Sequence, residues 1–367
     1  MHITRINLTN YRNIRSWVVE PHRSLTVFLG PNAAGKTNTI EAIQVACTGT
    51  SFRKPAWSEL VQWGEPVSQI TVEADGETPG VSTTLVVGVD GQRVWKLNGV
   101  KKGSAASATR FVPVVVFTPD DLAMVKGPAE QRRSNLDALG EQLSPVYGAL
   151  RRDYMRVVRQ RNALLREEAT PTELEPWDVQ VITLGARLHT HRRRLLSRVA
   201  GYLTPTYHEL SKGESLGIRM VDRCGVGETP IDKEVPNDVV VEGLTRELAR
   251  RMSDEHLRKV TLVGPHRDDI EFTINGAEAR SFASQGQQRT IALAWKLAEV
   301  RVVNTVLMKT PVLLLDDVMS ELDQDRRAAL TGLIQQDIQT FVTTTNTGYF
   351  DPELLDQASV LKVGVGS

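Results

Sequence analysis

A glycine-rich segment near the N-terminus has the residue types and spacing of a phosphate-binding loop. The eight residues Gly30-Pro31-Asn32-Ala33-Ala34-Gly35-Lys36-Thr37 fit the pattern G-x-x-x-x-G-K-[ST]. An apolar run of strand type precedes them and a helical pattern follows, which is the context that this motif requires. In such a loop the backbone N–H groups point at a phosphate beside the positive end of the helix. Lys36 would reach the β- and γ-phosphates, and Thr37 would place its hydroxyl on Mg²⁺. The alternative is a glycine-rich turn that binds nothing.

Two adjacent carboxylates end a second apolar strand, far along the chain. Residues 311–315 are apolar, and Asp316 and Asp317 follow them directly. A buried strand should not end in adjacent acids unless a cation or a catalytic role compensates their charge. We expect Asp316 to hold Mg²⁺, through water, and Asp317 to be the catalytic residue that orients or activates an attacking water. The alternative is a solvated acidic turn, which is weaker once the phosphate loop is present.

A third polar segment lies just before a helical pattern. It reads Ser284-Gln285-Gly286-Gln287-Gln288, and apolar residues then recur on one face from 291 to 302. A Ser and a Gly at a helix N-terminus can form a second anion site. Taken alone, the segment is better explained as an ordinary helix cap.

The chemistry-bearing segments must be positioned by an α/β fold that a helical insert interrupts. Short strands are predicted at residues 2–8, 15–21, 25–29, 67–75, 81–89, 94–97 and 112–117. Helical spacing dominates from about 120 to 210, where a break at Thr170-Pro171-Thr172 predicts an antiparallel pair of helices. Each arm is expected to have about 20–30 residues and a length of roughly 30–45 Å. We therefore expect an N-terminal part at 1–118, a helical arm domain at 119–255 and a C-terminal part at 256–367.

Composition excludes several classes of protein. The chain of 367 residues has 44 Lys and Arg and 44 Asp and Glu, so a uniformly basic coat for nucleic acid is excluded, although a local basic patch is not. No run approaches the 18 or so apolar residues of a membrane span, and the first residues lack the apolar core of a signal peptide. With only Cys47 and Cys224, we expect neither a disulfide framework nor a zinc cluster. A cytoplasmic protein is expected.

Together, these motifs resemble those of ABC-type ATPases. Beside the phosphate loop and Asp316-Asp317, the segment from Ser284 to Gln288 resembles the signature motif of that class. The resemblance implies that Ser284, Gly286 and Gln287 bind the γ-phosphate of ATP held by a second subunit. Residues 338–346 resemble the last core strand and switch of the class, with Thr345 or Asn346 at the switch position.

The moderate insert between the motifs resembles that of the RecF family of recombination mediators. Further support comes from the segments Asn10-Tyr11-Arg12-Asn13, Thr118-Pro119-Asp120-Asp121-Leu122 and Gly264-Pro265-His266-Arg267-Asp268-Asp269. This resemblance covers essentially the whole chain and implies an ABC-type P-loop ATPase head, of mixed sheets and helices, with an inserted arm.

The RecF resemblance also implies function and partners. It implies ATP and Mg²⁺ as cofactors and a homodimer that forms on ATP. It implies binding of double-stranded DNA and of junctions between single and double strands, and cooperation with RecR and RecO in loading RecA, with no membrane partner. A weak, DNA-stimulated ATPase that works as a switch is expected. The alternatives are a transport ATPase subunit and a scaffold with negligible hydrolysis.

Two departures from common ATPase patterns are visible. Ala33 stands where many related loops have Gly, which should be harmless if its φ is negative. Asp317 stands where ABC ATPases usually have Glu, which shortens the reach to water and suggests slow turnover.

The expected helix pair is rich in arginine. Residues 151–198 contain eleven Arg and six acidic residues, an excess of five positive charges in a neutral chain. These charges should fan around the helices, either as a solvated face or as contacts to duplex phosphates. His189 and His191 are expected to be exposed polar residues, and Cys47 a small core residue.

Overall fold

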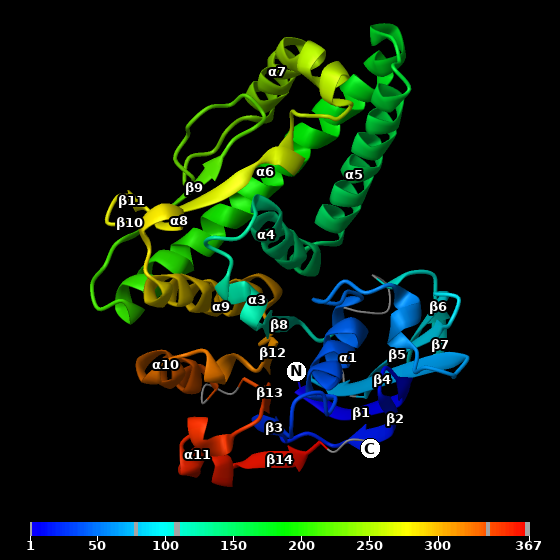
Figure 1. Cartoon of the computed structure of the whole chain (residues 1–367), viewed down its shortest axis with the longest axis vertical. Coiled ribbons are helices and arrows are strands. Elements are labelled where there is room, and N and C mark those ends of the chain that lie inside the picture. The colour runs from blue at the N-terminus through cyan, green and yellow to red at the C-terminus, as the bar shows by residue number, and fades with distance from the viewer. Residues whose placement is uncertain (1, 77–79, 106–110, 335–337, 364–367) are drawn as a thin grey trace. The chain divides into compact units, whose positions relative to one another are not determined.

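The chain forms two compact units. A computed structural model describes residues 2–76, 80–105, 111–334 and 338–363 (Figure 1). Unit 1 comprises Met1–Leu122 and Glu299–Ser367, and unit 2 comprises Ala123–Ala298. The expected arm domain ended at residue 255, whereas unit 2 continues to 298, because a strand after residue 255 pairs with a strand of the arm.

A parallel sheet of five strands carries the predicted site in unit 1. Its order is β14-β3-β13-β12-β8, and every neighbouring pair is parallel. The strands are β3 (Leu25–Leu29), β8 (Val114–Phe117), β12 (Val312–Asp316), β13 (Thr340–Thr344) and β14 (Ala358–Lys362). Because parallel strands end at the same edge, residues 30 and 316–317 are brought to one edge of the sheet. The strand predicted at 25–29 is confirmed.

A second sheet in unit 1 is antiparallel. Its order is β2-β1-β4-β5-β6-β7. The strands are β1 (His2–Tyr11), β2 (Ile14–Val19), β4 (Val67–Asp75), β5 (Val81–Gly88), β6 (Arg93–Leu97) and β7 (Val100–Lys102). Buried and more exposed residues alternate along β5, as expected of a strand with one face in the core.

Helix α1 (Lys36–Thr48) contacts strands of both sheets. Its apolar residues Ile40, Ala42, Ile43, Val45 and Ala46 are all fully buried, so the helix is covered on several sides. A helix that is apolar around most of its circumference is typical of a core position. The phosphate loop at its N-terminus is therefore anchored by the main core of the unit.

The remaining short elements of unit 1 connect or flank these sheets. They are η1 (Trp57–Leu60), α3 (Pro119–Leu122), η3 (Val318–Ser320), α10 (Gln324–Ile334), η4 (Thr347–Tyr349) and α11 (Pro352–Asp356).

Unit 2 is built around long helices, as predicted. They are α4 (Ala129–Leu143), α5 (Pro145–Arg166), α6 (Pro171–Leu210) and α7 (Asn237–Arg258). Thr170 and Glu173 form a capping box at the start of α6, and Pro171 occupies its first turn. Helix α5 has 22 residues, within the expected range, but α6 has 40 and is roughly 60 Å long, because it continues through Pro176 and Pro205.

A small antiparallel sheet and three further helices complete unit 2. The sheet has the order β11-β10-β9. The elements are β9 (Leu216–Val221), η2 (Pro265–Arg267), β10 (Asp269–Ile274), β11 (Ala277–Glu278), α8 (Ala279–Phe282) and α9 (Gln285–Leu307), the last of which continues into unit 1.

The arginines of the helix pair do not form one solvated face. Arg161, Arg192 and Arg193 are buried, and Arg192 makes two hydrogen bonds to the carboxylate of Asp137 at 2.8 and 2.7 Å. The expectation that these charges fan around the helices was wrong for these three side chains, because Arg161 and Arg192 are bound to carboxylates inside the unit and Arg193 to backbone carbonyl oxygens. The expectation for His189 was also wrong, since its side chain is fully buried.

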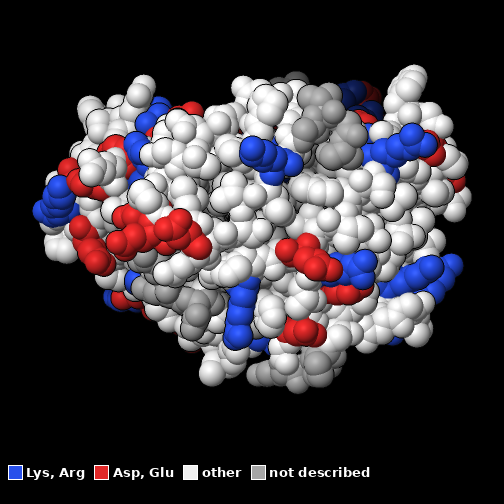
Figure 2. All heavy atoms as spheres, turned by 90° about the horizontal axis from the view of Figure 1, so that it is seen from below, with Lys and Arg blue, Asp and Glu red and all other residues white. Residues whose placement is uncertain are grey.

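Other arginines of the pair remain on the surface, namely Arg152, Arg156, Arg159, Arg166, Arg187, Arg194 and Arg198. Figure 2 shows one face of the molecule, on which Lys and Arg atoms and Asp and Glu atoms form separate small groups among uncharged atoms. The described part of that face carries no continuous basic coat. None of the described helices is both long and apolar enough to cross a membrane.

Candidate nucleotide site

The loop between β3 and α1 has the backbone of a phosphate-binding loop. A Cβ at Gly30 would lie 2.4 Å from the carbonyl oxygen of Val363, so only glycine fits there. Gly35 has a φ of +106°, which also favours glycine. Ala33 has a φ of +65°, so the condition under which alanine would be harmless here is not met. An L-residue in this conformation costs about 1–2 kcal/mol, and such strain is typical of ligand-binding loops.

Lys36 folds back over this loop. Its Nζ donates hydrogen bonds to the carbonyl oxygens of Gly30 at 2.6 Å and Pro31 at 2.8 Å. Burial lowers the pKa of Lys36, while Asp317 and Asp316 oppose that change. The ammonium group is therefore held at the loop by carbonyl acceptors and by the two acids, in position to meet an anion.

Asp316 receives two hydroxyl hydrogen bonds on one carboxylate oxygen. Thr37 Oγ1 and Thr343 Oγ1 each donate to Asp316 Oδ1 at 2.8 Å. Asp316 is buried at the end of β12, Thr37 lies in the first turn of α1, and Thr343 lies on the neighbouring strand β13. The structure thus brings Thr37 and Asp316, predicted from motifs and 279 positions apart, into direct contact.

Asp317 lies beside this pair in an unusual conformation. Its φ is +52°, and its backbone N–H donates to Thr343 Oγ1 at 2.9 Å. Burial raises the pKa of Asp317, Lys36 opposes this change, and Asp316 and Glu321 add to it. Thr343 therefore contacts both acids. Its hydroxyl oxygen accepts from the backbone N–H of Asp317, and its hydroxyl donates to the carboxylate of Asp316.

Thr343 was missed by the sequence reasoning. The run Thr343-Thr344-Thr345 at the end of a predicted strand was the available signal, but the strand order that places Thr343 beside Asp316 is visible only in the fold. Thr345, predicted at the switch position, is exposed just beyond β13. Asn346 accepts a hydrogen bond from Gly348 N at 2.8 Å and so caps η4.

A chain of polar side chains borders the other side of the loop. Asn13 Nδ2 donates to the carbonyl oxygen of Ala33 at 3.4 Å, and Asn38 Nδ2 donates to Asn13 Oδ1 at 2.6 Å. Arg53 in turn donates to Asn38 Oδ1 at 2.7 Å. Through Asn13, these contacts connect the loop to the turn between β1 and β2. They give a structural reason for the second asparagine of the motif at residues 10–13.

The chain matches a known family over nearly its full length. The family model described as the RecF/RecN/SMC N terminal domain matches residues 2–361. The protein from Heliobacterium modesticaldum named DNA replication and repair protein RecF is 37% identical, over 100% of this chain and 98% of its own length. The chain belongs to the RecF family. A protein of the same name from Geobacillus thermodenitrificans is 35% identical, over 100% of this chain and 99% of its own length.

Solved structures agree with the assignment to the RecF family. A structure of the recombination mediator protein RecF-ATP in the RecFOR pathway has a TM-score of 0.90 and 29% identity, and the match covers 100% of this chain and 96% of that one. An Smc head bound to the C-winged helix domain of ScpA has a TM-score of 0.56 and 15% identity, over 99% and 94% of the two chains, so it supports the fold alone. The predicted ATPase-head fold with a helical insert is confirmed, and a transport ATPase subunit is set aside.

The predicted signature residues of this RecF-family chain lie in unit 2. Ser284 and Gln287 form a reciprocal cap on α9: Ser284 N donates to Gln287 Oε1 at 2.9 Å, and Gln287 N donates to Ser284 Oγ at 3.2 Å. Gln287 Nε2 also donates to Glu214 Oε1 at 2.8 Å. The ordinary helix cap is therefore present, and a γ-phosphate contact by Ser284, Gly286 and Gln287 stays a prediction.

Proposed function

We propose that this chain is an ATP-dependent recombination mediator that binds duplex DNA. The proposal depends on one observation: beside the phosphate loop, Thr37 Oγ1 donates a hydrogen bond to Asp316 Oδ1 at 2.8 Å. A hydroxyl at the first turn of a P-loop helix and a carboxylate at the end of a neighbouring strand are the pair that holds Mg²⁺ in nucleoside triphosphatases. The similar solved structures named RecF-ATP and RecF-ATPrS support ATP as the nucleotide.

The residues present fit a hydrated Mg²⁺ ion. Oxygen ligands are what this ion prefers, and it usually takes only one or two from protein carboxylates. Thr37 and Asp316 would hold it, and when bound it would neutralise charge on the β- and γ-phosphates. Lys36 then exchanges its two carbonyl acceptors for phosphate oxygens, while the N–H groups from Gly30 to Thr37 bind the remaining oxygens.

Asp317 is the proposed catalytic residue. Its backbone N–H is fixed by Thr343, and its carboxylate orients the attacking water and accepts its proton. Aspartate reaches less far than glutamate, so we infer weak hydrolysis that DNA stimulates and that resets a switch. A scaffold that binds ATP would differ only in its turnover, which would be negligible even with DNA.

The remaining parts of the proposal concern assembly and partners. ATP bound to Lys36 of one chain would be closed by Ser284, Gly286 and Gln287 of a second chain, which makes the homodimer depend on ATP. Thr345 would sense the γ-phosphate. The dimer would bind double-stranded DNA and single- to double-strand junctions and would act with RecR and RecO in loading RecA. The names of the similar proteins, which mention repair and the RecFOR pathway, support this assignment.

Replacing Lys36 tests the nucleotide site. Lys36→Ala removes the charge directed at the β- and γ-phosphates, so affinity for ATP should fall at least tenfold, and ATP turnover with and without duplex DNA should be lost. Equilibrium titration with a fluorescent ATP analogue measures the affinity. Lys126→Ala, which alters an exposed lysine of unit 2, is the control and should bind like the wild type. Equal affinity of the Lys36→Ala variant and the wild type would contradict the assignment.

A further inference from the structure

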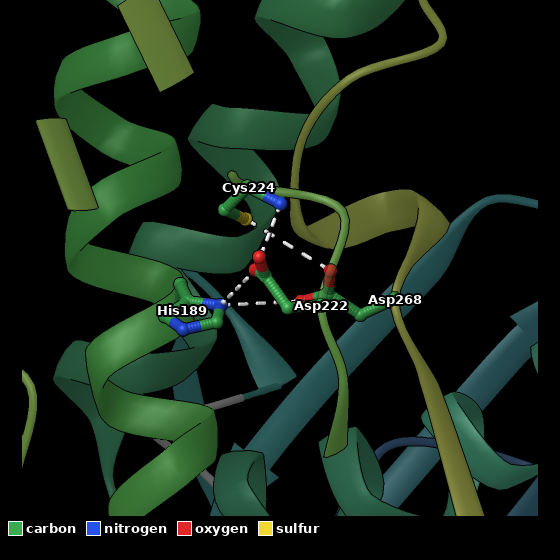
Figure 3. A group of neighbouring side chains, drawn as sticks. All are labelled: His189, Asp222, Cys224 and Asp268. Carbon is green, nitrogen blue, oxygen red and sulfur yellow. Dashed lines mark hydrogen bonds and ion pairs between the residues drawn. The ribbon is translucent and has the colours of Figure 1, made fainter. Parts of the chain in front are cut away.

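Four side chains with metal-binding chemistry meet inside unit 2, and none of them belongs to the proposed nucleotide site. The His189 cluster consists of His189 on α6, Asp222 and Cys224 after β9, and Asp268 just before β10 (Figure 3). One ligand atom from each lies within 4.8 Å of the others. His189 Nδ1 is 3.3 Å from Asp268 Oδ2 and 3.9 Å from Asp222 Oδ1, and Cys224 Sγ is 3.9 Å from Asp268 Oδ1.

The cluster is buried, and Arg192 and Arg133 act on Asp268, and Arg193 on Asp222, only through electrostatic attraction and not through hydrogen bonds to the carboxylates in the described structure. The side chains of His189, Asp222 and Asp268 are 1%, 9% and 2% exposed, and Cys224 is fully buried. Within the described ranges, no Lys or Arg side chain forms a salt bridge with Asp222 or Asp268. Two carboxylates held this far from water are costly unless a positive charge compensates them.

The ring of His189 is oriented with one nitrogen toward the carboxylates. Its Nδ1 faces Asp268 and Asp222, while its Nε2 is buried without a hydrogen-bond partner in the described structure. A cation bound at Nδ1 would supply positive charge at the carboxylates themselves.

Backbone N–H groups hold the two carboxylates in place. Asp222 accepts from the N–H groups of Cys224 at 2.8 Å, Val226 at 2.6 Å and Gly227 at 3.1 Å. Asp268 accepts from the N–H of Arg223 at 2.7 Å. Such secondary contacts orient the ligands of protein metal sites and tune their affinity.

The donor set selects zinc. One imidazole nitrogen, one thiol sulfur and two carboxylate oxygens are all zinc ligands, whereas Mg²⁺ and Ca²⁺ prefer oxygen alone. Zinc bonds of about 2.0–2.3 Å in a tetrahedron place ligand atoms roughly 3.3–3.7 Å apart. The three separations above exceed these distances by no more than about 0.6 Å, and the remaining ligand atoms lie within 4.8 Å of one another. Four protein ligands also close the coordination shell, as in structural zinc sites.

We propose that His189, Asp222, Cys224 and Asp268 form a structural zinc site that ties α6 to the ends of β9 and β10. The sequence predicted no zinc cluster, because the chain has only two cysteines. The proposed site requires only one cysteine, since His189 and two aspartates supply the other ligands.

Metal content and cobalt absorption test the site in the full chain. Protein produced in zinc-supplemented medium and freed of loose metal by gel filtration should contain about one zinc per chain. After exchange with Co²⁺, a thiolate-to-cobalt charge-transfer band should appear in the near ultraviolet. Cys224→Ser should abolish that band and weaken zinc binding at least tenfold. The matched control is Cys47→Ser, which changes the chain's other cysteine on α1 and should retain both properties.

A second measurement does not depend on a variant that folds. Zinc should raise the midpoint of thermal unfolding of the wild type relative to the same protein stripped with a chelator, because zinc binds the folded state. Wild-type protein without stoichiometric zinc and without the cobalt band would overturn the proposal. Equal zinc affinity and an unchanged cobalt band in Cys224→Ser would overturn it as well.

Discussion

Thr343 links the two acids on which the proposed chemistry depends. Its hydroxyl donates to Asp316 and accepts from the backbone of Asp317, so the residue proposed to hold the cation and the residue proposed to orient water share one support. The positive φ of Asp317 is tolerated because this hydrogen bond and the buried strand β12 fix the backbone on either side. At residue scale, then, the two carboxylates have different roles because their surroundings differ: Asp316 is bonded to hydroxyls, and Asp317 is left half-buried.

Asp317→Asn should separate binding from hydrolysis. The amide keeps the size of the side chain but cannot accept a proton, so ATP turnover should fall on the order of 100-fold while ATP affinity changes little. Steady-state phosphate release and nucleotide titration measure the two quantities. Glu353→Gln, which neutralises an exposed acid of the same unit, should match the wild type. Turnover by Asp317→Asn at the wild-type rate would mean that another residue positions the water.

At the scale of the elements, a buried charge network joins α4, α5 and α6. Asp137 accepts hydrogen bonds from Arg192, from Arg151 at 2.8 Å and from the hydroxyl of Tyr147 at 2.5 Å. Burial alone would raise the pKa of Asp137, but Arg192 and its other partners hold that pKa below its ordinary value. The network thus explains why arginine-rich helices pack against one another.

Asp137→Asn should strongly destabilise unit 2. The change leaves Arg192 buried without its full charge partner, which costs about 3–5 kcal/mol in comparable cases. Urea unfolding followed by circular dichroism measures the loss. The control is Asp153→Asn, which breaks an exposed pair with Arg156 and should cost no more than about 1 kcal/mol.

Asp137 should also make the stability of unit 2 depend on pH. The pKa of Asp137 is lower in the folded state than its ordinary value. Its contribution to the free energy of unfolding is therefore fully present above the ordinary aspartate pKa and is lost as the pH falls through the folded-state pKa. The difference in stability between wild type and Asp137→Asn should therefore shrink below about pH 4. A difference that stays constant down to acid unfolding would contradict this account of the network.

Exposed arginines on α5 are the best candidates for DNA contact. Arg152, Arg159 and Arg166 recur every seven residues and so lie along one side of the helix. Changing all three to Gln should reduce the slope of log affinity for duplex DNA against log salt by about 2–3, equally for unrelated sequences. Fluorescence anisotropy at several salt concentrations measures the slope.

Arginines of another helix provide the control for this experiment. Arg246, Arg250 and Arg251 lie on α7, and the last two pair with Glu247 and Asp254. Their triple change to Gln should leave the slope as in the wild type. Equal slopes for the wild type and the α5 variant would show that α5 is not the contact surface.

The sequence predicted the elements better than their extents and neighbours. Strands 25–29 and 67–75 and the break at Thr170 were predicted because alternation, turn residues and helix caps are local signals. The expected arm length of about 20–30 residues underestimated α6, which continues through Pro176 and Pro205. The motifs predicted that Thr37 and Asp316 belong to one magnesium site, but not their direct hydrogen bond. Thr343 and the burial of Arg192 and His189 were not predicted, because strand order and helix orientation are set by tertiary packing.

At the scale of the whole molecule, the proposed function requires two chains. The P-loop lies in unit 1, and the residues from Ser284 to Gln287 lie in unit 2. An ATP-bridged dimer with a twofold axis would complete two equivalent sites, so one substitution would damage both. ADP lacks the γ-phosphate that would join Lys36 of one chain to Ser284 of the other, so hydrolysis would release the dimer.

Sedimentation velocity of the wild type and of Ser284→Arg tests this central claim most directly. The wild type should be a dimer with ATP and Mg²⁺ and a monomer, or a weak dimer, with ADP. Ser284→Arg should bind ATP but remain a monomer, because of its bulk and its misplaced charge. Ser253→Arg, at an exposed serine of α7, is the control and should dimerise normally. If Ser284→Arg dimerises on ATP as well as the wild type does, Ser284 is not at the interface and the account of a shared ATP site is contradicted.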